Sequence, residues 1–133
     1  MLTGRCLCGA VVFSAEEAAP EFTACHCGMC RRWSGGSPLF TTHAKGVTFV
    51  SEEKLGRYES SDWAERGFCT VCGTPLYYRF KQSGAMMMSV GVFDEASAFR
   101  IKREIFVDRK PDGYALAGEH PRWTESETLA RLK

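Results

Sequence analysis

Seven cysteines stand in three tight groups along this 133-residue chain, and their spacing suits the binding of metal ions. In chain order the groups are Cys6 and Cys8; Cys25, Cys27 and Cys30; and Cys69 and Cys72. Cysteines one or two residues apart present their sulfurs to a single point from a sharp turn, which favours zinc. The count divides into two pairs and one triple, and these two arrangements predict different chemistry.

The two pairs together supply four sulfurs, enough to close a tetrahedral zinc site. A glycine follows each pair directly, Gly9 after the first and Gly73 after the second. Glycine permits a positive φ or a close approach of the backbone to a sulfur. Backbone N–H groups directed at the sulfurs would then offset the excess negative charge of four thiolates. We therefore expect a structural zinc ion on Cys6, Cys8, Cys69 and Cys72.

The triple, C-H-C-G-M-C from Cys25 to Cys30, supplies three sulfurs and leaves one coordination position of a zinc ion open. Water, hydroxide or a substrate thiolate would fill that position, and a thiol bound there would lose its proton. This provides a nucleophile at neutral pH, so Cys25, Cys27 and Cys30 are the candidate catalytic residues. The alternatives are a second closed site, with His26 or a distant residue as the fourth ligand, and a cluster without metal.

Disulfide bonds and plain buried thiols are the alternatives for the cysteines as a whole. Seven is an odd number, which leaves one thiol over in a disulfide framework. The start of the chain, M-L-T-G-R-C, lacks the basic and apolar segments of a signal peptide, so we expect a cytoplasmic protein. Thiols stay reduced in that compartment, which favours metal ligands. A redox-active C-x-x-C would need a βαβ context that the sequence does not show.

Several other polar residues are weaker candidates. His26 stands between two ligands and is expected to point away from their metal, as a bystander or a residue that faces the substrate. Arg31 and Arg32 follow the triple and could hold a substrate carboxylate, or remain solvated surface charges. His43 and His120 fall in apparent turns and carry no strong functional signal. The methionines at 86–88 indicate strand packing, because adjacent strand residues point to opposite faces.

Composition excludes several classes of function. The apolar fraction of 44% and the charged fraction of 25% are typical of a globular protein. The formal net charge of +1 argues against a nucleic-acid binder, and no apolar run approaches the roughly 20 residues of a membrane span. The length predicts a single domain over residues 1–133.

Short runs rich in β-branched and aromatic residues, separated by turn residues, predict a mainly antiparallel β protein. The expected strands are 10–14, 21–25, 38–42, 47–51, 55–59, 67–69, 76–80, 86–93 and 100–107. Two short helices are expected, over 27–33 and over 124–133; in the second, Thr124 and Glu127 form a capping box, with Leu129 and Leu132 on one face. The strand–knuckle–strand pattern occurs around both Cys8 and Cys72, so two facing hairpins could share one metal and pin two sheets together.

Five motifs follow one another along the chain: G-R-C-L-C-G, C-H-C-G-M-C, G-F-C-T-V-C-G-T-P-L, V-G-V-F-D and I-F-V-D-R-K-P-D. Together they resemble one known family, the glutathione-dependent formaldehyde-activating enzymes, which also contains centromere protein V. The resemblance covers about residues 2–115, nearly the whole chain. A three-part cysteine signature in this order is far more specific than one C-x-x-C.

The resemblance implies a β-tent fold, small antiparallel β-sheets joined by a structural zinc with few short helices. It implies two zinc ions per chain, divided between the pairs and the triple as ligand counting predicts. The implied activity is that of a carbon–sulfur lyase that joins formaldehyde and glutathione as S-hydroxymethylglutathione. A small thiol such as glutathione would be the substrate, although no residue besides the cysteines is assigned to its recognition. The alternatives are a non-catalytic zinc-binding interaction module and a thiol or zinc sensor.

Overall fold

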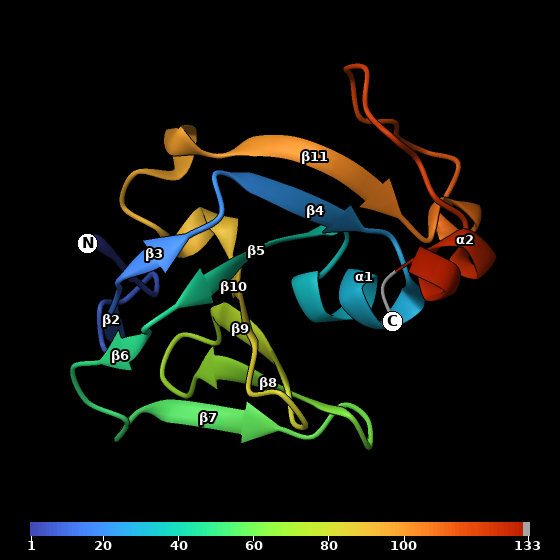
Figure 1. Cartoon of the computed structure of the whole chain (residues 1–133). Coiled ribbons are helices and arrows are strands. Elements are labelled where there is room, and N and C mark those ends of the chain that lie inside the picture. The colour runs from blue at the N-terminus through green and yellow to red at the C-terminus, as the bar shows by residue number, and fades with distance from the viewer. Residues whose placement is uncertain (132–133) are drawn as a thin grey trace.

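Two β-sheets and two short α-helices make up the computed structural model, which describes residues 1–131 (Figure 1). A three-stranded sheet has the order β1-β2-β6, with bounds Leu2–Arg5, Val12–Ala15 and Thr48–Phe49. A larger sheet has the order β11-β4-β5-β10-β9-β8-β7, and β3 pairs with β5 beside it. In chain order its strands are β3 Glu17–Ala18, β4 Glu21–Cys25, β5 Leu39–Lys45, β7 Leu55–Tyr58, β8 Ala64–Cys69, β9 Pro75–Phe80, β10 Met86–Ser89 and β11 Arg100–Ile105.

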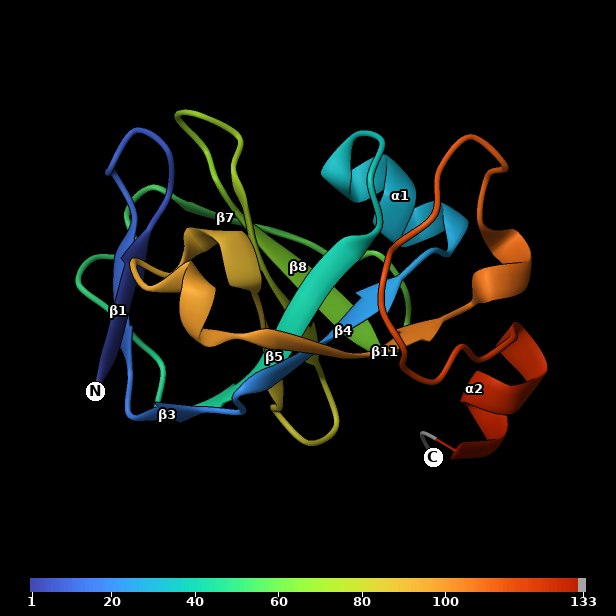
Figure 2. The ribbon, with the colours of Figure 1, turned by 90° about the horizontal axis from the view of Figure 1, so that it is seen from above.

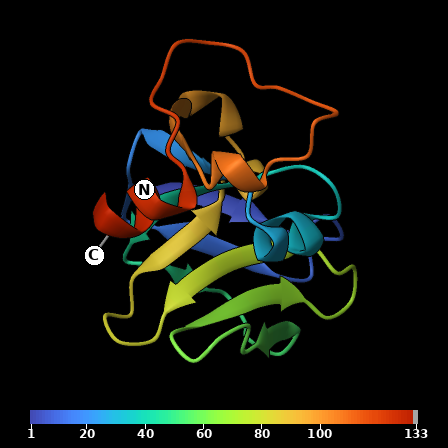
Figure 3. The same cartoon turned by 90° about the vertical axis from the view of Figure 1, so that its right-hand side faces the viewer.

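Helices and 3-10 turns connect the strands. The α-helices are α1 Gly28–Ser34 and α2 Glu125–Arg131, and the 3-10 turns are η1 Val90–Val92, η2 Ala96–Ala98 and η3 Val107–Arg109. Helix α1 follows β4 directly, whereas α2 ends the described chain beside η3 (Figure 2). Between η3 and α2 the chain arches outward over this end of the molecule and then returns to β11 (Figure 3).

The strand pairs are antiparallel, as predicted, except that β11 lies parallel to β4. In the register of this parallel pair, Glu104 lies opposite Ala24 and Ile105 lies opposite Cys25. The His26 N–H continues the pairing by donating to the Ile105 carbonyl over 3.1 Å. The parallel pair therefore brings a residue of β11 beside the cysteine triple.

Phe13 of β2 lies at the centre of the core between the two sheets. Its side chain is 1% exposed, and its ring packs edge-on against Phe93, with the centroids 5.3 Å apart. A Cβ atom on Gly4 would lie 2.5 Å from that ring, so only glycine lets β1 approach so closely. Leu76 and Met88, both fully buried, supply the opposite face from the larger sheet. The small sheet is therefore held by apolar packing as well as by its cysteines.

Most of the predicted elements are confirmed, with boundary shifts of a few residues. Strand β4 has the predicted bounds, and α1 begins one residue after Cys27. The capping box of α2 is present, since Glu127 N–H donates to Thr124 Oγ1 and Glu127 Oε1 accepts from Thr124 N–H. In this helix Leu129 is 57% exposed, and Thr128 is the buried residue. Leu132 and the end of the predicted helix lie outside the described residues.

Two strand predictions need correction. Strands β1 and β3 are absent from the predicted set, because L-T-G-R carries a glycine and only one apolar side chain, and β3 is two residues long. The predicted strand 86–93 ends at Ser89, where the chain turns through η1. The turn carries Phe93 to the small sheet, where it bridges to Gly4. Within residues 1–131, none of the helices has the length and apolar character needed to cross a membrane.

Replacing Phe13 tests the packing between the sheets. We expect Phe13→Ala to lower the free energy of unfolding by about 3–5 kcal/mol, because the cavity it leaves is surrounded by rigid β structure. The matched control is Val12→Ala, which changes a partly exposed neighbour on the other face of β2 and is expected to cost less than about 1 kcal/mol. Chemical denaturation measures both, and equal losses would contradict this description of the core.

Candidate metal centres

The four cysteines of the two pairs meet where the β1–β2 turn faces the β8–β9 turn. Their sulfur atoms all lie within 4.8 Å of one another. Cys6 Sγ lies 3.7 Å from Cys8 Sγ, which in turn lies 3.8 Å from Cys69 Sγ. Zinc–sulfur bonds of about 2.3 Å at tetrahedral angles place sulfurs about 3.8 Å apart. All seven cysteines of the chain are free, and the residues of this four-sulfur cluster fit a zinc ion.

Backbone N–H groups surround the four-sulfur cluster and offset its negative charge. Val11 N–H donates to Cys6 Sγ over 3.3 Å, and Cys72 N–H donates to Cys69 Sγ over 3.4 Å. These contacts depend on the sharp turns at Gly9 and Gly73, whose φ angles of +81° and +80° confirm the predicted need for glycine.

The hydroxyl of Thr74 prepares Cys72 to act as a thiolate. It lies 3.1 Å from Cys72 Sγ, and this hydrogen bond, together with backbone N–H groups, lowers the pKa of Cys72 to about 5. The Leu7 N–H from the facing turn donates to the same hydroxyl oxygen over 3.1 Å. Thr74 therefore links the two turns and supports the ionised form that metal binding requires.

The cysteines of the triple meet where β4 ends and α1 begins. Cys25 is the last residue of β4, Cys27 is the N-cap of α1, and Cys30 is buried in the first turn of the helix. Their sulfurs lie within 4.8 Å of one another. Cys27 Sγ accepts the Cys30 N–H over 3.4 Å, so a sulfur of the triple also caps the helix. This three-sulfur cluster could hold a metal ion through three protein ligands.

Hydrogen bonding within the triple favours one ionised sulfur. Hydrogen bonding with Cys25 and Cys30 lowers the pKa of Cys27 in spite of burial. Hydrogen bonding with Cys27 raises the pKa of Cys25. The ionised form is therefore favoured at Cys27 over Cys25.

His26 does not complete the triple. Its side chain is fully buried; Nδ1 lies 2.8 Å from the Tyr114 hydroxyl, and Nε2 lies 2.7 Å from Glu104 Oε1. The carboxylate accepts the Nε2 proton, and in the neutral imidazole Nδ1 accepts the proton of Tyr114. Both ring nitrogens are thus engaged away from the sulfurs. Among residues 1–131, no fourth cysteine, histidine or carboxylate joins the three sulfurs.

Glu104 is the centre of this buried network. Besides His26, its carboxylate accepts hydrogen bonds from His120 Nε2 over 2.6 Å and from Arg122 Nε over 2.8 Å. Burial alone would raise the pKa of the Glu104 carboxyl, but the bonds from His120 and His26 and the charge of Arg122 outweigh burial and hold that pKa below its ordinary value. The network ties the segment before α2 to the loop between Cys25 and Cys27.

Two further features lie beside the three-sulfur cluster and were not predicted from the sequence. Arg66 of β8 is 2% exposed and donates from Nη2 to Cys30 Sγ over 3.6 Å. A hollow of about 310 Å³ lies beside α1 and reaches the turn of the four-sulfur cluster. Its lining residues are Trp33, Tyr58, Phe68, Gly73 and Pro75. Nothing in the local sequence around Arg66 or Glu104 marks either residue, because their partners lie far away along the chain.

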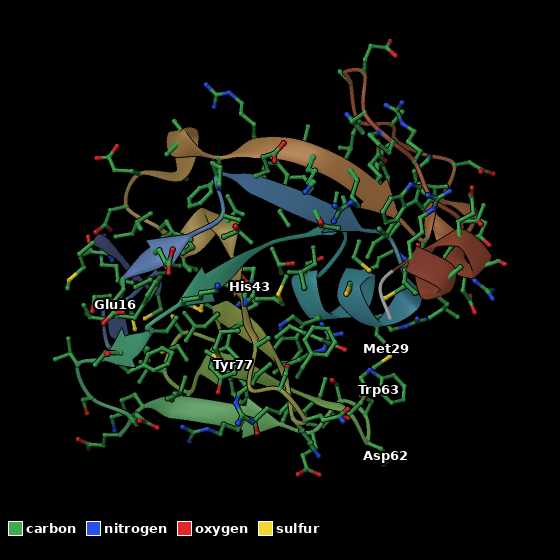
Figure 4. All side chains as sticks on the ribbon, viewed as in Figure 1. Glu16, Met29, His43, Asp62, Trp63 and Tyr77 are labelled. Carbon is green, nitrogen blue, oxygen red and sulfur yellow. The ribbon has the colours of Figure 1, made fainter. Side chains whose placement is uncertain are left out.

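The remaining candidate residues have different positions. Arg31 is half-buried near Tyr114 and its Nε has no hydrogen-bond partner within residues 1–131. Arg32 is exposed and donates to the Gly28 carbonyl of its own helix. His120 is a partner of Glu104 and not a free turn residue. His43 is exposed on β5, away from Met29 of α1 (Figure 4).

The fold and the two clusters define a class: a mainly β protein with two cysteine clusters that could hold metal ions. The chain belongs to the GFA family, described as glutathione-dependent formaldehyde-activating enzyme, whose sequence model matches residues 1–109. The resemblance in the cysteine motifs is thereby confirmed.

Individual relatives agree with the family assignment. The chain is 33% identical over 131 residues to an uncharacterized lyase of Schizosaccharomyces pombe. This alignment covers 97% of this chain and 95% of the relative. It is 28% identical over 88 residues to a Halomonas elongata protein named "Putative glutathione-dependent formaldehyde-activating enzyme", covering 58% of this chain and 55% of the relative. A crystal structure from Rhodobacter sphaeroides has the same fold, with a TM-score of 0.58 and 21% identity over 92% of this chain and 99% of that one.

The two clusters are expected to respond differently to loss of one sulfur. Cys69→Ser should severely destabilise the protein, because Cys69 is fully buried between the sheets. Cys27→Ser should spare the fold, since serine is a good N-cap and can replace the sulfur at the start of α1. Thermal unfolding and zinc content of both purified variants measure this difference. Equal collapse of both variants would favour two structural sites.

The Glu104 network is expected to stabilise the folded protein at the pH values at which the Glu104 carboxyl is ionised. Glu104→Gln should lower the free energy of unfolding by roughly 3 kcal/mol near pH 7, because one buried partner of the network is lost. The lowered pKa of Glu104 means that this stabilisation is present above the ordinary carboxyl pKa and is lost as the pH falls through the lowered value. The difference from the wild type should therefore shrink as the pH falls below the ordinary carboxyl pKa and through the lowered one. Exposed Glu53→Gln is the control, and a pH-independent difference would contradict the assignment.

Proposed function

We propose that this protein is a zinc-dependent carbon–sulfur lyase-type enzyme that acts on a small thiol or its aldehyde adduct, in the manner of an S-hydroxymethylglutathione synthase. Family membership and the names of the relatives support a glutathione-related lyase. In this proposal residues 1–133 form one GFA-type domain. The substrate partner is a small thiol such as glutathione, and the protein is cytoplasmic and binds neither nucleic acid nor membrane.

The proposal assigns two zinc ions to the two clusters. Cys6, Cys8, Cys69 and Cys72 hold a structural ion, and Cys25, Cys27 and Cys30 hold the catalytic one. A zinc ion with three thiolate ligands and an open position supplies a positive centre that favours the thiolate form of a small thiol and polarises a carbonyl. The distances within the four-sulfur cluster and the close grouping of the triple support this assignment.

The single observation that carries the proposal is that both ring nitrogens of His26 are hydrogen-bonded away from the three sulfurs. This residue is the nearest histidine to the triple in sequence, yet both of its ring nitrogens are bonded elsewhere, to Tyr114 and Glu104. Its side chain is also fully buried on that side of the loop. A site closed by His26 is therefore disfavoured, and a site with an open fourth position is favoured.

The reaction needs no oxidant or reductant. A carbon–sulfur bond forms between the thiol sulfur and formaldehyde carbon, the carbonyl electron pair moves to oxygen, and oxygen gains the proton that the thiol loses. The lyase direction reverses each change. Arg31 is the candidate to hold a carboxylate of the thiol, because its Nε is unpartnered within residues 1–131 and Arg32 bonds to its own helix.

Zinc content and product formation test the proposal together. Purified protein should contain about two zinc ions, one much more resistant to chelation than the other. With ¹³C-formaldehyde and glutathione, the NMR signal of the hydroxymethyl adduct should exchange faster with enzyme than without it. Cys27→Ser serves as the control, since it should remain folded and lose this acceleration.

Two other outcomes would redirect the proposal. A single tightly held zinc ion would contradict the enzyme as described and favour the non-catalytic interaction module. Loss and return of the weaker ion with thiol concentration, without acceleration of adduct exchange, would favour the thiol or zinc sensor. A panel of small thiols in the same assay identifies the substrate, and activity with another thiol but not glutathione would exclude glutathione.

A further inference from the structure

Arg66 is a buried cation whose neighbours are a sulfur atom, a hydroxyl and aromatic rings. Its guanidinium Nε donates to Ser60 Oγ over 3.1 Å, and Nη2 donates to Cys30 Sγ over 3.6 Å. The guanidinium carbon lies 4.8 Å from the ring centroid of Tyr78 and 5.8 Å from that of Trp33. The side chain is 2% exposed, so water does not solvate its charge.

No carboxylate balances this charge. None of the ion pairs within residues 1–131 includes Arg66. Arginine remains protonated in proteins, and an unpaired buried charge is costly. The aromatic faces of Tyr78 and Trp33 offset part of that cost. The remaining negative partner is the three-sulfur cluster, which Arg66 touches through Cys30.

The charge of Arg66 matters for what the three-sulfur cluster can accept. Three thiolates around a divalent zinc ion leave one net negative charge, which repels an anionic fourth ligand. The buried guanidinium cancels that charge at hydrogen-bond distance from one of the ligand sulfurs. Among residues 1–131 no arginine donates to a sulfur of the four-sulfur cluster, whose hydrogen bonds come from backbone N–H groups and Thr74. The two clusters thus differ in charge as well as in ligand number.

The geometry of the guanidinium supplies a second contribution. Its donors form a rigid planar fork, so the position of one nitrogen fixes the others. Nη2 is held at Cys30 Sγ, whereas Nη1 is buried and has no hydrogen-bond partner within residues 1–131. A buried donor of this kind is costly unless something binds to it. Nη1 is therefore available to an anionic atom that lies beside the Cys30 sulfur.

We propose that Arg66 is the specificity-determining residue of the three-sulfur centre, which selects an anionic sulfur over a neutral ligand as its fourth partner. This inference rests on the proposed function and names its substrate class, a thiol bound in thiolate form. Arg66 balances the charge of the centre through Cys30 and donates from Nη1 to the incoming sulfur. The side chain acts on binding and takes no proton.

Ligand binding to cobalt-substituted protein tests the role of Arg66 without measuring turnover. The visible spectrum of cobalt changes when a fourth ligand binds, so it reports the Kd of each probe. The probes are 2-mercaptoethanol, which binds as an anionic thiolate, and imidazole, which binds as a neutral ligand. In Arg66→Met we expect the Kd of 2-mercaptoethanol to rise about tenfold or more, because a unit charge is lost at short range. The Kd of imidazole should change less than about twofold.

Matched variants separate charge from packing. Arg66→Lys keeps the charge but loses the planar fork, so the thiol Kd should rise less than in Arg66→Gln. Because the ratio of the two Kd values is measured within each folded protein, this pair also answers the question if Arg66→Met does not fold. Arg103 is the control: it is stacked on Trp123, 4.8 Å from the ring centroid, and donates to Thr23. Arg103→Met should leave both Kd values unchanged.

The possible outcomes are distinct. Equal weakening of 2-mercaptoethanol and imidazole in the Arg66 variants would show a structural role only and overturn the inference, while the proposed function would stand. A wild-type protein that binds imidazole but not the thiol would also overturn it. A wild-type spectrum that responds to neither probe would overturn the open site and the inference together.

Discussion

The architecture depends on one constraint, the meeting of four sulfur atoms from two hairpins that belong to different sheets. The first hairpin carries Cys6 and Cys8 on the small sheet, and the second carries Cys69 and Cys72 on the larger sheet. Sulfur–sulfur separations of 3.7 and 3.8 Å leave little freedom in how the hairpins face each other. Apolar packing around Phe13 acts at the same junction, so the two sheets are fixed at adjacent points and by different forces.

The three-sulfur centre is built on a different principle. Its three sulfurs come from one short stretch of chain, the end of β4 and the start of α1, so local structure alone brings them together. The long-range contacts at this centre come instead from residues that are not candidate ligands. Glu104 and Tyr114 hold His26 from one side, and Arg66 reaches Cys30 from β8. The four-sulfur cluster thus joins two hairpins of different sheets. The three-sulfur cluster forms within one segment, and residues from other elements pack around it.

The sequence predicts the cysteine groups well because their chemistry is contained in their spacing. The pairing of Cys6 and Cys8 with Cys69 and Cys72 follows from ligand counting, and the structure places the sulfurs of each predicted group together. The sequence could not reveal Glu104, which lies 78 residues from His26, or Arg66, which lies 36 residues from Cys30. Both residues stand among ordinary charged residues. Strand β1 was not predicted for a related reason. Glycine is needed at position 4 because the Phe13 ring leaves no room for a Cβ atom, and glycine has a low strand propensity.

The residues that hold His26 extend further along the chain than the family model does. The family match ends at residue 109, yet Tyr114, His120 and Arg122, which hold His26 and Glu104, all come after it. A fragment cut at that boundary would keep every cysteine and still leave His26 Nδ1 without its hydroxyl partner and Glu104 without two of its donors. In this protein, the segment that the family model matches is shorter than the part of the chain that shapes the three-sulfur centre.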